Sequence, residues 1–526
     1  PIQPAEMMNQ RIRNAAVAAK VCTPESLIHH FKDGMKIGVS GFTPAGYPKM
    51  MPKTLADHVE ENELQGQMSF TLCSGASIGA DFDNRWASLG MTRARFPYQT
   101  GKDINTAINK GECMMSDRHL SMFPQNLMYG FYNLHDKAPE GQATPFDIGI
   151  VEATAIREDG SIVLGSSCGI SPEVVKGCKK LIIEVNTSIP SFEGIHDIYT
   201  VDNPPNRVPI PLTSVDQRIG ELGIQVDPSK IIGVIESRLP DKGRALAEPD
   251  QGSKDIAENI LEFLYHERNM GRQPESLHPL QSGVGSIANA VVAGLATGDF
   301  DGCEVWTEVL QDSVLDVIDA GKLKSCSATS LSLSEPGFER FFKNWDRYFP
   351  KCHLRPSSIS NHPEVIRRLG VTAMNTPIEV DIYGHANSSH LMGARLVNGI
   401  GGSGDFLRNA KLSMMHFPST RPSKTDPFGI SSVVPMVSHV DHPESDLDVL
   451  VSEQGLADLR GLGPKQRARQ IIMNCAHPKY RDMLMDYVRM CERTIGFHEP
   501  QDLHKALGMH LALSDKGSMR DFDLYE

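Results

Sequence analysis

Short, almost uninterrupted apolar runs are the feature that most constrains what this chain can fold into. They occur at 35–42, 68–75, 146–156, 181–186 and 231–237, and stretches typical of amphipathic helices separate them. Strands that are apolar on both faces are characteristic of parallel sheets covered by helices on each side. We therefore expect an α/β protein with largely parallel sheets.

The length of the chain indicates more than one domain. It has 526 residues, whereas a single hydrophobic core stops growing near about 250–300 residues. A polar, turn-rich stretch at 241–255 leads into a helical pattern, after which strands and helices alternate again. We predict an N-terminal α/β domain at 1–240, a linker and connecting helix at 241–275, and a C-terminal α/β domain at 276–526.

Composition excludes several classes of protein. The formal net charge is −13, whereas a protein that binds nucleic acid needs a basic surface to displace counterions. The ten cysteines form no CxxC pair, which indicates reduced thiols in a reducing compartment. No apolar run approaches the roughly 18 residues of a membrane span. We expect a protein of the cytoplasm or the mitochondrial matrix, with no partner in nucleic acid or membrane.

A glycine-rich turn lies at 281–285 and leads into a helical pattern. Such a turn exposes backbone N–H groups at a helix N-terminus, which suits an anion or a developing oxyanion. The spacing Gly283-x-Gly285-x-x-Ala288 also matches a dinucleotide fingerprint, and Glu304 follows about twenty residues later. A nicotinamide site, an oxyanion site and a plain tight turn are all open at this point.

Glu308 lies near the carboxyl end of an apolar strand pattern, before a helix that we expect from about Ser313. Ligands of α/β sheets bind at the carboxyl ends of strands. A carboxylate there can act as a base or a nucleophile, although a solvated or ion-paired glutamate is the commoner case.

Other polar segments compete for a functional role. Residues 398–410 hold four glycines within six residues, which suits close approach of backbone to a ligand or a flexible loop. His439, Asp441 and His442 lie together but match no standard metal spacing, so we expect a polar loop there. Glu453 ends another apolar strand pattern.

Longer motifs connect these features. The stretches that carry the connection are SGFTPAGYPK (40–49), GASIGAD (75–81), PYQTGKDINTAINKG (97–111), QSGVGSIANAV (281–291), WTEVLQDS (306–313), SNHPEVIRRLGV (360–371), EVDIYGHANSSH (379–390), NGIGGSGDFLRNA (398–410), the long stretch at 435–462 and NCAHPKYRDML (474–484). With them the chain resembles the acetyl-CoA hydrolase/transferase family of class I CoA-transferases over roughly residues 10–520. The resemblance argues against the nicotinamide interpretation of Gly283 and Gly285.

The resemblance implies a fold and a mechanism. The family fold is two similar open-sheet α/β domains, of the CoA-transferase and NagB/RpiA-like type, with the active site between them, usually in a homodimer. Its glutamate nucleophile matches Glu308. Glu308 would form first an acyl-glutamyl anhydride and then a glutamyl-CoA thioester. Coenzyme A would be both a substrate and part of the covalent intermediate, and the resemblance implies no permanent cofactor and no metal.

The resemblance also implies roles for other residues of the site. Backbone amides of Val284 and Gly402 match the oxyanion donors, and Asn361, Ser77 and Glu453 match polar residues of the acyl pocket. The positions that match CoA-contacting turns are Gly283, Val284, Gly285, Ser286, Ile287, Asn398 and Gly402. Lys424 is either a contact to a CoA phosphate or a solvated lysine.

The resemblance does not determine which carboxylic acids exchange CoA. We expect transfer of CoA from succinyl-CoA to acetate first, with acetyl-CoA hydrolysis and propionyl-CoA:succinate transfer as alternatives. A CoA-binding protein without turnover is a further alternative, which Glu308 and the two glycine turns disfavour.

Overall fold

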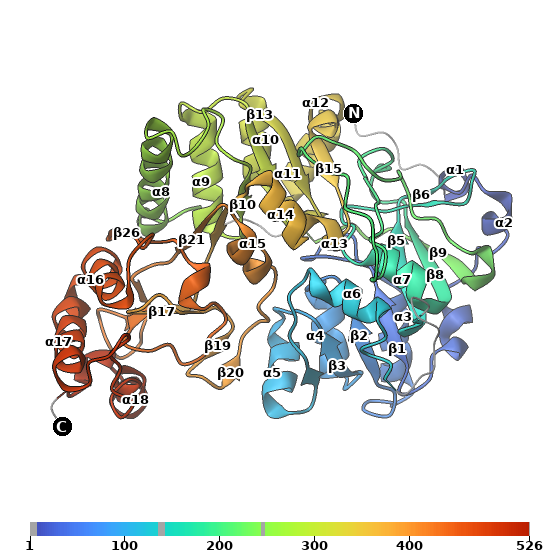
Figure 1. The fold of residues 1–526 in the computed structure, drawn as a ribbon. Helices are drawn as coiled ribbons and strands as arrows, with labels where there is room; N and C mark the ends of the chain where they lie inside the picture. Colours follow the sequence, from blue (N-terminus) through green and yellow to red (C-terminus); the bar gives the residue numbers. More distant parts are fainter. Residues whose placement is uncertain (1–7, 135–142, 243–247, 525–526) are drawn as a thin grey trace. The chain divides into compact units, whose positions relative to one another are not determined.

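The structure is a computed structural model that describes residues 8–134, 143–242 and 248–524. The chain forms two compact units (Figure 1). Unit 1 holds residues 1–245, 304–319 and 323–369, and unit 2 holds 246–303, 320–322 and 370–526. In the described part of the chain, no helix has the length and apolar character needed to cross a bilayer.

Unit 1 is built on a seven-stranded sheet whose pairs are parallel. Its strands are, in order across the sheet, β4 (Met114–Met115), β3 (Thr92–Phe96), β2 (Phe70–Cys73), β1 (Lys36–Val39), β5 (Phe146–Ala153), β8 (Cys178–Asn186) and β9 (Ile231–Ser237). The helices that precede or connect them are α1 (Met8–Arg11), α2 (Ala15–Ala18), α3 (Met50–Glu61), α4 (Ala80–Ser88), α5 (Lys102–Lys110), α6 (Met122–Met128) and α7 (Ser171–Gly177). The predicted parallel α/β class is confirmed.

Helix α3 shows why these segments pack as they do. Met51, Leu55 and Val59 recur at a spacing of one helical turn and are fully buried. They join Phe70 and Trp86 in one apolar cluster on the sheet. An amphipathic helix whose apolar stripe covers a sheet of apolar strands is the arrangement that the sequence pattern predicts.

A later part of the chain completes unit 1. Its elements are β11 (Cys303–Trp306), β12 (Val309–Leu310), α10 (Asp312–Asp319), β13 (Leu323–Ala328), β14 (Ser330–Leu331), α11 (Glu335–Lys343), α12 (Trp345–Tyr348), β15 (Cys352–Leu354), α13 (Ser357–Ser360) and α14 (Pro363–Leu369). Strand β13 pairs β15 in parallel. Val309 packs with Phe42, Ala76 and Leu120 of the N-terminal segment.

Unit 2 has a sheet run in the order β10-β16-β21-β25-β26. Its elements are α8 (Gln251–Asn269), β10 (Leu280–Ser282), α9 (Ser286–Thr297), β16 (Thr372–Asn375), β17 (Glu379–Asp381), β18 (Ala386–Asn387), β19 (His390–Leu391), β20 (Arg395–Leu396), α15 (Ser403–Asn409), β21 (Leu412–His416), β22 (Thr420–Arg421), β23 (Ile430–Ser431), β24 (Val433–Val434), β25 (Val449–Ser452), β26 (Gly455–Asp458), α16 (Pro464–Cys475), α17 (Pro478–Thr494) and α18 (Gly508–Lys516). Figure 1 shows α8 beside α9, both in green.

The compact units do not follow the order of the sequence. Glu308 lies in the predicted C-terminal domain, yet its segment packs in unit 1. The predicted domains at 1–240 and 276–526 divide the chain by sequence order, and that division stays a prediction. Residues 243–247 of the predicted linker lie outside the described residues.

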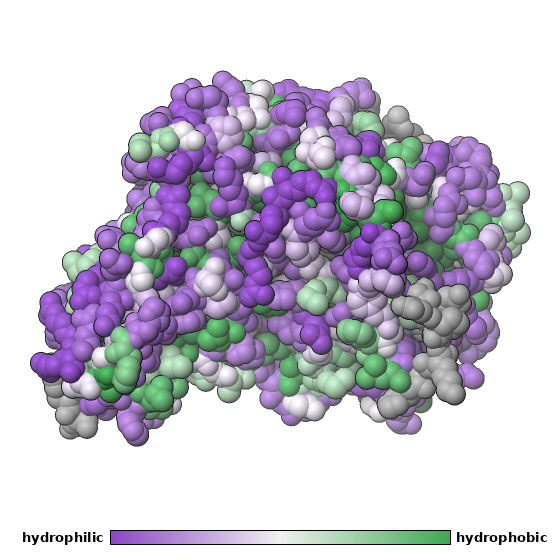
Figure 2. Space-filling view, in the orientation of Figure 1, coloured by the Kyte–Doolittle hydropathy of each residue, from purple (hydrophilic) through white to green (hydrophobic). Residues whose placement is uncertain are grey.

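The surface is predominantly polar on the face that Figure 2 shows, where hydrophilic residues surround small hydrophobic areas. Large apolar residues that are exposed lie mostly in loops and near the chain end, as with Phe497 and Leu503. Most apolar side chains are therefore buried between the sheets and the helices that cover them.

Candidate functional site

The backbone around Glu308 is held by hydrogen bonds to the neighbouring strand segment. Thr307 N–H donates to the Ser327 carbonyl at 3.0 Å, and the Glu308 carbonyl accepts from the amides of Thr329 and Ser330, each at 3.0 Å. The side chain is half-buried. These hydrogen bonds fix the backbone of Glu308 just beyond the carboxyl end of β11. In α/β proteins, functional groups are commonly placed at this end of the strands.

Asn361 meets Glu308 directly. Its Nδ2 donates a hydrogen bond to Glu308 Oε1. Ser360 Oγ donates to Asn361 Oδ1 at 2.8 Å, which orients the amide with its NH₂ group toward Glu308. Trp306 Nε1 donates to the Ser360 carbonyl at 2.8 Å and ties this turn to β11. A hydrogen bond donated to a carboxylate favours its ionised form, which is the nucleophilic one.

Ser77 is the third predicted site residue in unit 1. It is buried, and its carbonyl accepts from Thr43 N–H at 2.8 Å. Its neighbour Ala76 packs in the apolar cluster that contains Val309, the residue after Glu308. The structure therefore brings the segments of Ser77 and Glu308 to one part of unit 1.

In unit 2, the first glycine turn and Glu453 follow strands of the parallel sheet. Strand β10 pairs β16, β16 pairs β21, and β21 pairs β25, all in parallel. Gly283 follows β10, and Glu453 follows β25. Because carboxyl ends of parallel strands lie at the same edge, the first glycine turn and Glu453 lie on that edge.

The first glycine turn connects β10 to α9. Gly283 N–H donates to the Met374 carbonyl at 3.1 Å. Gly285 has φ 145°, a conformation that favours glycine, and caps the helix. Ser286 Oγ lies 3.1 Å from Ser253 Oγ on α8. Val284 lies in the turn with 47% of its surface exposed, and Ile287 lies in the first turn of α9.

The second glycine turn precedes α15. Gly402 is the residue before this helix and is buried. Asn398 Nδ2 donates to the carbonyls of Ser388 at 3.0 Å and Gly399 at 2.8 Å, which shapes the start of the turn. Ser403 Oγ donates to the Ile400 carbonyl at 2.9 Å and lies 3.0 Å from His442 Nε2. This turn is an ordered loop with its own hydrogen bonds.

Glu453 is held by its neighbours in unit 2. Ser419 donates to its carboxylate through the backbone N–H at 2.8 Å and through Oγ. Gln454 Nε2 donates to Oε1 at 3.0 Å. Lys424 is exposed. Exposure is compatible both with a contact to a CoA phosphate and with a solvated lysine.

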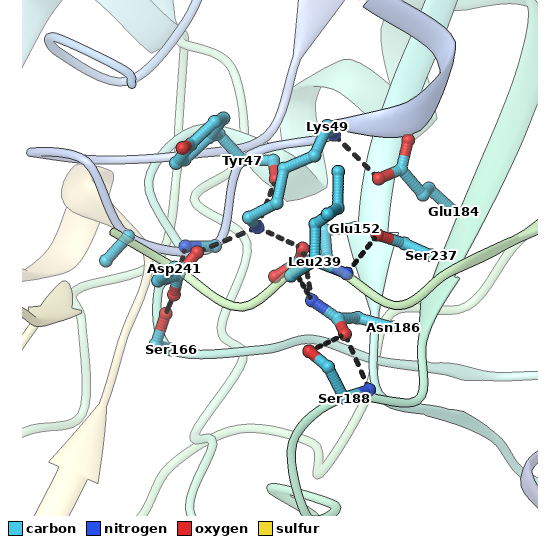
Figure 3. Close-up of polar contacts among 12 residues, drawn as sticks. Tyr47, Lys49, Glu152, Ser166, Glu184, Asn186, Ser188, Ser237, Leu239 and Asp241 are labelled. Carbon is cyan, nitrogen blue, oxygen red and sulfur yellow. Dashed lines mark hydrogen bonds and ion pairs between the residues drawn. The ribbon is translucent and has the colours of Figure 1, made fainter. Parts of the chain in front are cut away.

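A buried charge network in unit 1 is absent from the sequence prediction. Lys49 Nζ lies 2.5 Å from Glu152 Oε2 and 2.8 Å from Asp241 Oδ1, with all three side chains buried (Figure 3). Burial raises the pKa of Glu152 to about 8 despite the nearby ammonium. Asp241 also accepts from Gly46 N–H at 3.1 Å.

This network anchors the segment SGFTPAGYPK. The backbone amides of Lys49, Met50 and Met51 donate to the Glu184 carboxylate at the start of α3, as Figure 3 shows for Lys49. A carboxylate at a helix N-terminus also complements the helix dipole. Sequence reasoning missed the network because isolated lysines and acids are usually solvated.

The histidines at 439–442 point to different partners. His439 Nε2 lies 3.4 Å from Asp441 Oδ1, whereas His442 is buried against Ser403 and Ser388. Asp441 accepts from Ser389 Oγ at 2.8 Å. These contacts agree with the polar loop that the sequence indicates.

Comparison with known proteins agrees with the motifs. The family model "Acetyl-CoA hydrolase/transferase N-terminal domain" matches residues 5–236, and the corresponding C-terminal domain model matches 337–488. A protein of Schizosaccharomyces pombe named acetyl-CoA hydrolase is 53% identical over 520 residues, covering 98% of this chain and 99% of its own. The Saccharomyces cerevisiae protein of the same name is 52% identical over 520 residues, covering 98% of each chain.

Solved structures share the fold. RipA from Yersinia pestis has a TM-score of 0.70 at 20% identity, covering 90% of this chain and 98% of its own. A 4-hydroxybutyrate CoA-transferase from Porphyromonas gingivalis has a TM-score of 0.60 at 19% identity, with the same coverage. At these identities the likeness concerns the fold, and it agrees with the CoA-transferase-like architecture expected from the sequence.

Proposed function

Because the chain belongs to the acetyl-CoA hydrolase/transferase family, we propose that it acts on acetyl-CoA with the Glu308 carboxylate as nucleophile. The observation that carries the proposal is the hydrogen bond from Asn361 to Glu308 at the carboxyl end of β11. Both residues lie in motifs shared with the family, and the amide keeps the carboxylate oriented. An oriented, ionised carboxylate is what attack on a thioester requires.

The proposed first half-reaction transfers CoA from the acetyl group to Glu308. A Glu308 oxygen attacks the acetyl carbonyl carbon, the C–S bond breaks, and CoA leaves as a thiolate from an acetyl-glutamyl anhydride. The thiolate then attacks the glutamyl carbonyl of the anhydride, and acetate leaves. The product is a glutamyl-CoA thioester, so the bond energy of the thioester is retained without ATP.

The second half-reaction depends on the acceptor. Water attacks the glutamyl-CoA carbonyl, releases CoA and restores the Glu308 carboxylate, which completes hydrolysis. A carboxylic acid instead forms a new anhydride and thiolate, and the thiolate carries CoA to the acid. One nucleophile therefore serves both hydrolysis and transfer.

Each attack passes through a tetrahedral oxyanion that needs hydrogen-bond donors. We assign this role to the backbone N–H groups of Val284 and Gly402, one in each glycine turn. Loss of one such donor typically costs about 10²–10³ in rate. Ser77 and Glu453 are assigned to positioning the acid. The turn residues Gly283, Gly285, Ser286, Ile287 and Asn398, together with Lys424, are assigned to CoA.

Acetyl-CoA hydrolysis is the better supported outcome. The curated relatives at 52–54% identity are named acetyl-CoA hydrolases, whereas the sequence analysis placed succinyl-CoA:acetate transfer first. The family description includes transferases, so transfer to succinate stays the second candidate, with propionyl-CoA:succinate transfer as its variant. A homodimer in the cytoplasm or the mitochondrial matrix is part of the same proposal.

Turnover with and without an acceptor acid tests the proposal. Acetyl-CoA consumption is followed through free CoA and through succinyl-CoA, with succinate absent and then present. Free CoA formed at the same rate in both cases supports hydrolysis, while rapid succinyl-CoA formation supports transfer. Glu308→Gln should lower either rate by at least about 10³-fold, as for other nucleophile deletions. Turnover that persists in this variant would overturn the proposal.

A further inference from the structure

Three side chains of unit 2 converge outside the residues assigned to catalysis. Potential ligand atoms of His385, Glu444 and Glu499 all lie within 4.8 Å of one another, and each residue is half-buried. They come from the turn between β17 and β18, from the short helix η4 (Glu444–Asp446) and from the segment after α17. Three segments distant in sequence thus place one imidazole and two carboxylates at one point.

The imidazole is held by an acid behind it. His385 Nδ1 lies 3.1 Å from Asp381 Oδ2, whose side chain is only 3% exposed. Asp381 Oδ1 also accepts the backbone amides of Tyr383, Gly384 and His385, each at 3.0 Å. A carboxylate on one ring nitrogen fixes the tautomer and leaves Nε2 as the nitrogen that can bind a metal, the usual arrangement at zinc sites.

Hydrogen bonds also hold the backbone segments that carry the two glutamates. Tyr383 OH donates to the Pro500 carbonyl, next to Glu499, and Gln501 Nε2 donates to the Pro435 carbonyl at 2.9 Å. Arg467 Nη1 donates to the Glu444 carbonyl at 2.8 Å. The backbone on both sides of the cluster is therefore fixed before any ligand binds.

One carboxylate oxygen of the cluster is buried without a compensating hydrogen bond. Within the described parts of the chain, Glu444 Oε2 has no hydrogen-bond partner. A buried carboxylate oxygen beside a second carboxylate is costly unless a proton or a cation lies between them.

We propose that His385, Glu444 and Glu499 bind a divalent first-row transition metal, zinc in the first instance, as a structural clamp of unit 2. One imidazole and two carboxylates with water as fourth ligand is a tetrahedral zinc ligand set. Magnesium is disfavoured because it prefers oxygen ligands in octahedral geometry. Binding releases any proton held by His385. The clamp joins the β17–β18 turn, η4 and the segment after α17, and it adds no step to the reaction of Glu308.

The test measures metal binding by the full-length protein. The chelator-treated protein is titrated with Zn²⁺, with Co²⁺ as a spectroscopic probe and Mg²⁺ as the comparison, and its melting temperature is recorded. We expect one equivalent of Zn²⁺ to bind and to raise the melting temperature, with no such effect of Mg²⁺. The Co²⁺ complex should show tetrahedral d–d bands without sulfur charge-transfer bands.

Matched variants assign the site. His385→Gln and Glu499→Gln should weaken Zn²⁺ binding at least about tenfold, since even outer-shell changes cost that much. His498→Gln and Glu258→Gln, which alter exposed residues of unit 2, should bind as the wild type does. Equal affinity in all four variants, thiolate bands with Co²⁺, or no Zn²⁺ binding by the wild type would each overturn the proposal. Loss of Glu308 activity bears on the catalytic proposal alone.

Discussion

At the scale of single residues, the pairing of Asn361 with Glu308 yields a prediction about pH. In Asn361→Asp, a carboxylate replaces the donor amide beside Glu308. Like charges disfavour ionisation of both groups, so the acid limb of the pH–rate profile should move to higher pH. The measurement is kcat/KM against pH for the wild type and the variant.

A control separates this charge effect from loss of the hydrogen bond. Asn361→Ala removes the donor without adding a charge, so it should lower the rate while displacing the acid limb less than Asn361→Asp does. Equal displacement in the two variants would contradict the role given to Asn361.

Only some residues of the site could be predicted from the sequence. Glu308 was identifiable because it ends an apolar strand and lies in a family motif. Asn361 was predicted as a residue of the acyl pocket from the resemblance alone. Its hydrogen bond to Glu308 is a finding of the structure, because no periodic pattern joins positions so far apart in sequence. The Lys49 network and the cluster of His385, Glu444 and Glu499 were missed for the same reason, since burial of a charged group depends on partners brought together only by folding.

At the scale of elements, Glu267 links α8 to the turn after β26. Its carboxylate accepts from Arg460 Nη1 at 2.7 Å and from Arg272 Nη2 at 2.6 Å, and the side chain is 2% exposed. Glu267→Gln should lower the free energy of unfolding by about 2–3 kcal/mol, between the roughly 0–1 of an exposed pair and the 3–5 of a buried one. The urea midpoint measures the loss, with Glu262→Gln on the exposed face of α8 as control.

The same link predicts a pH dependence of stability. Burial alone would raise the pKa of Glu267, but the hydrogen bonds of Arg460 and Arg272 outweigh it and lower the pKa from 4.5 to about 2. The unfolded chain then binds more protons than the folded one between these values. The stabilisation is complete above pH ~4.5 and is lost as pH falls toward 2, so the wild type and Glu267→Gln should converge in stability on acidification. A constant difference would contradict the assignment.

Most parallel strands were predictable at the element scale because their residues are buried and apolar, as in β5, β8 and β9. Strand β3 was not, because it carries Arg95, whose buried side chain pairs with Asp83 at 2.8 Å. Strand β10 has only three residues after Pro279. The segment 430–434 forms only the short strands β23 and β24, because apolarity alone does not distinguish a strand from a buried loop.

At the scale of the whole molecule, unit 1 depends on a segment that follows part of unit 2 in sequence. Arg355 Nε pairs with Asp197 Oδ2 at 2.8 Å, with both side chains fully buried. Ser330 Oγ donates to the Phe42 carbonyl at 2.9 Å, and Val309 covers Phe42. A fragment of residues 1–245 would leave Asp197 without this partner and expose that cluster.

We therefore expect the fragment 1–245 to lack a cooperative fold. Its near-UV circular dichroism should be weak and its urea transition broad, compared with the full chain under the same conditions. A monomeric fragment with a sharp transition and the near-UV bands of the full chain would contradict this interdependence, and would favour a boundary near residue 240 as an independent folding limit.

The most direct test of the central claim is to find the covalent intermediate on Glu308. The enzyme is incubated with acetyl-CoA and treated with borohydride, which reduces a glutamyl-CoA thioester to an alcohol, and the peptide containing residues 306–313 is mapped by mass. We predict reduction at Glu308 in the wild type and in Glu304→Gln, and none without acetyl-CoA. An unmodified Glu308 in an enzyme that turns over acetyl-CoA, or modification of another residue, would contradict the account.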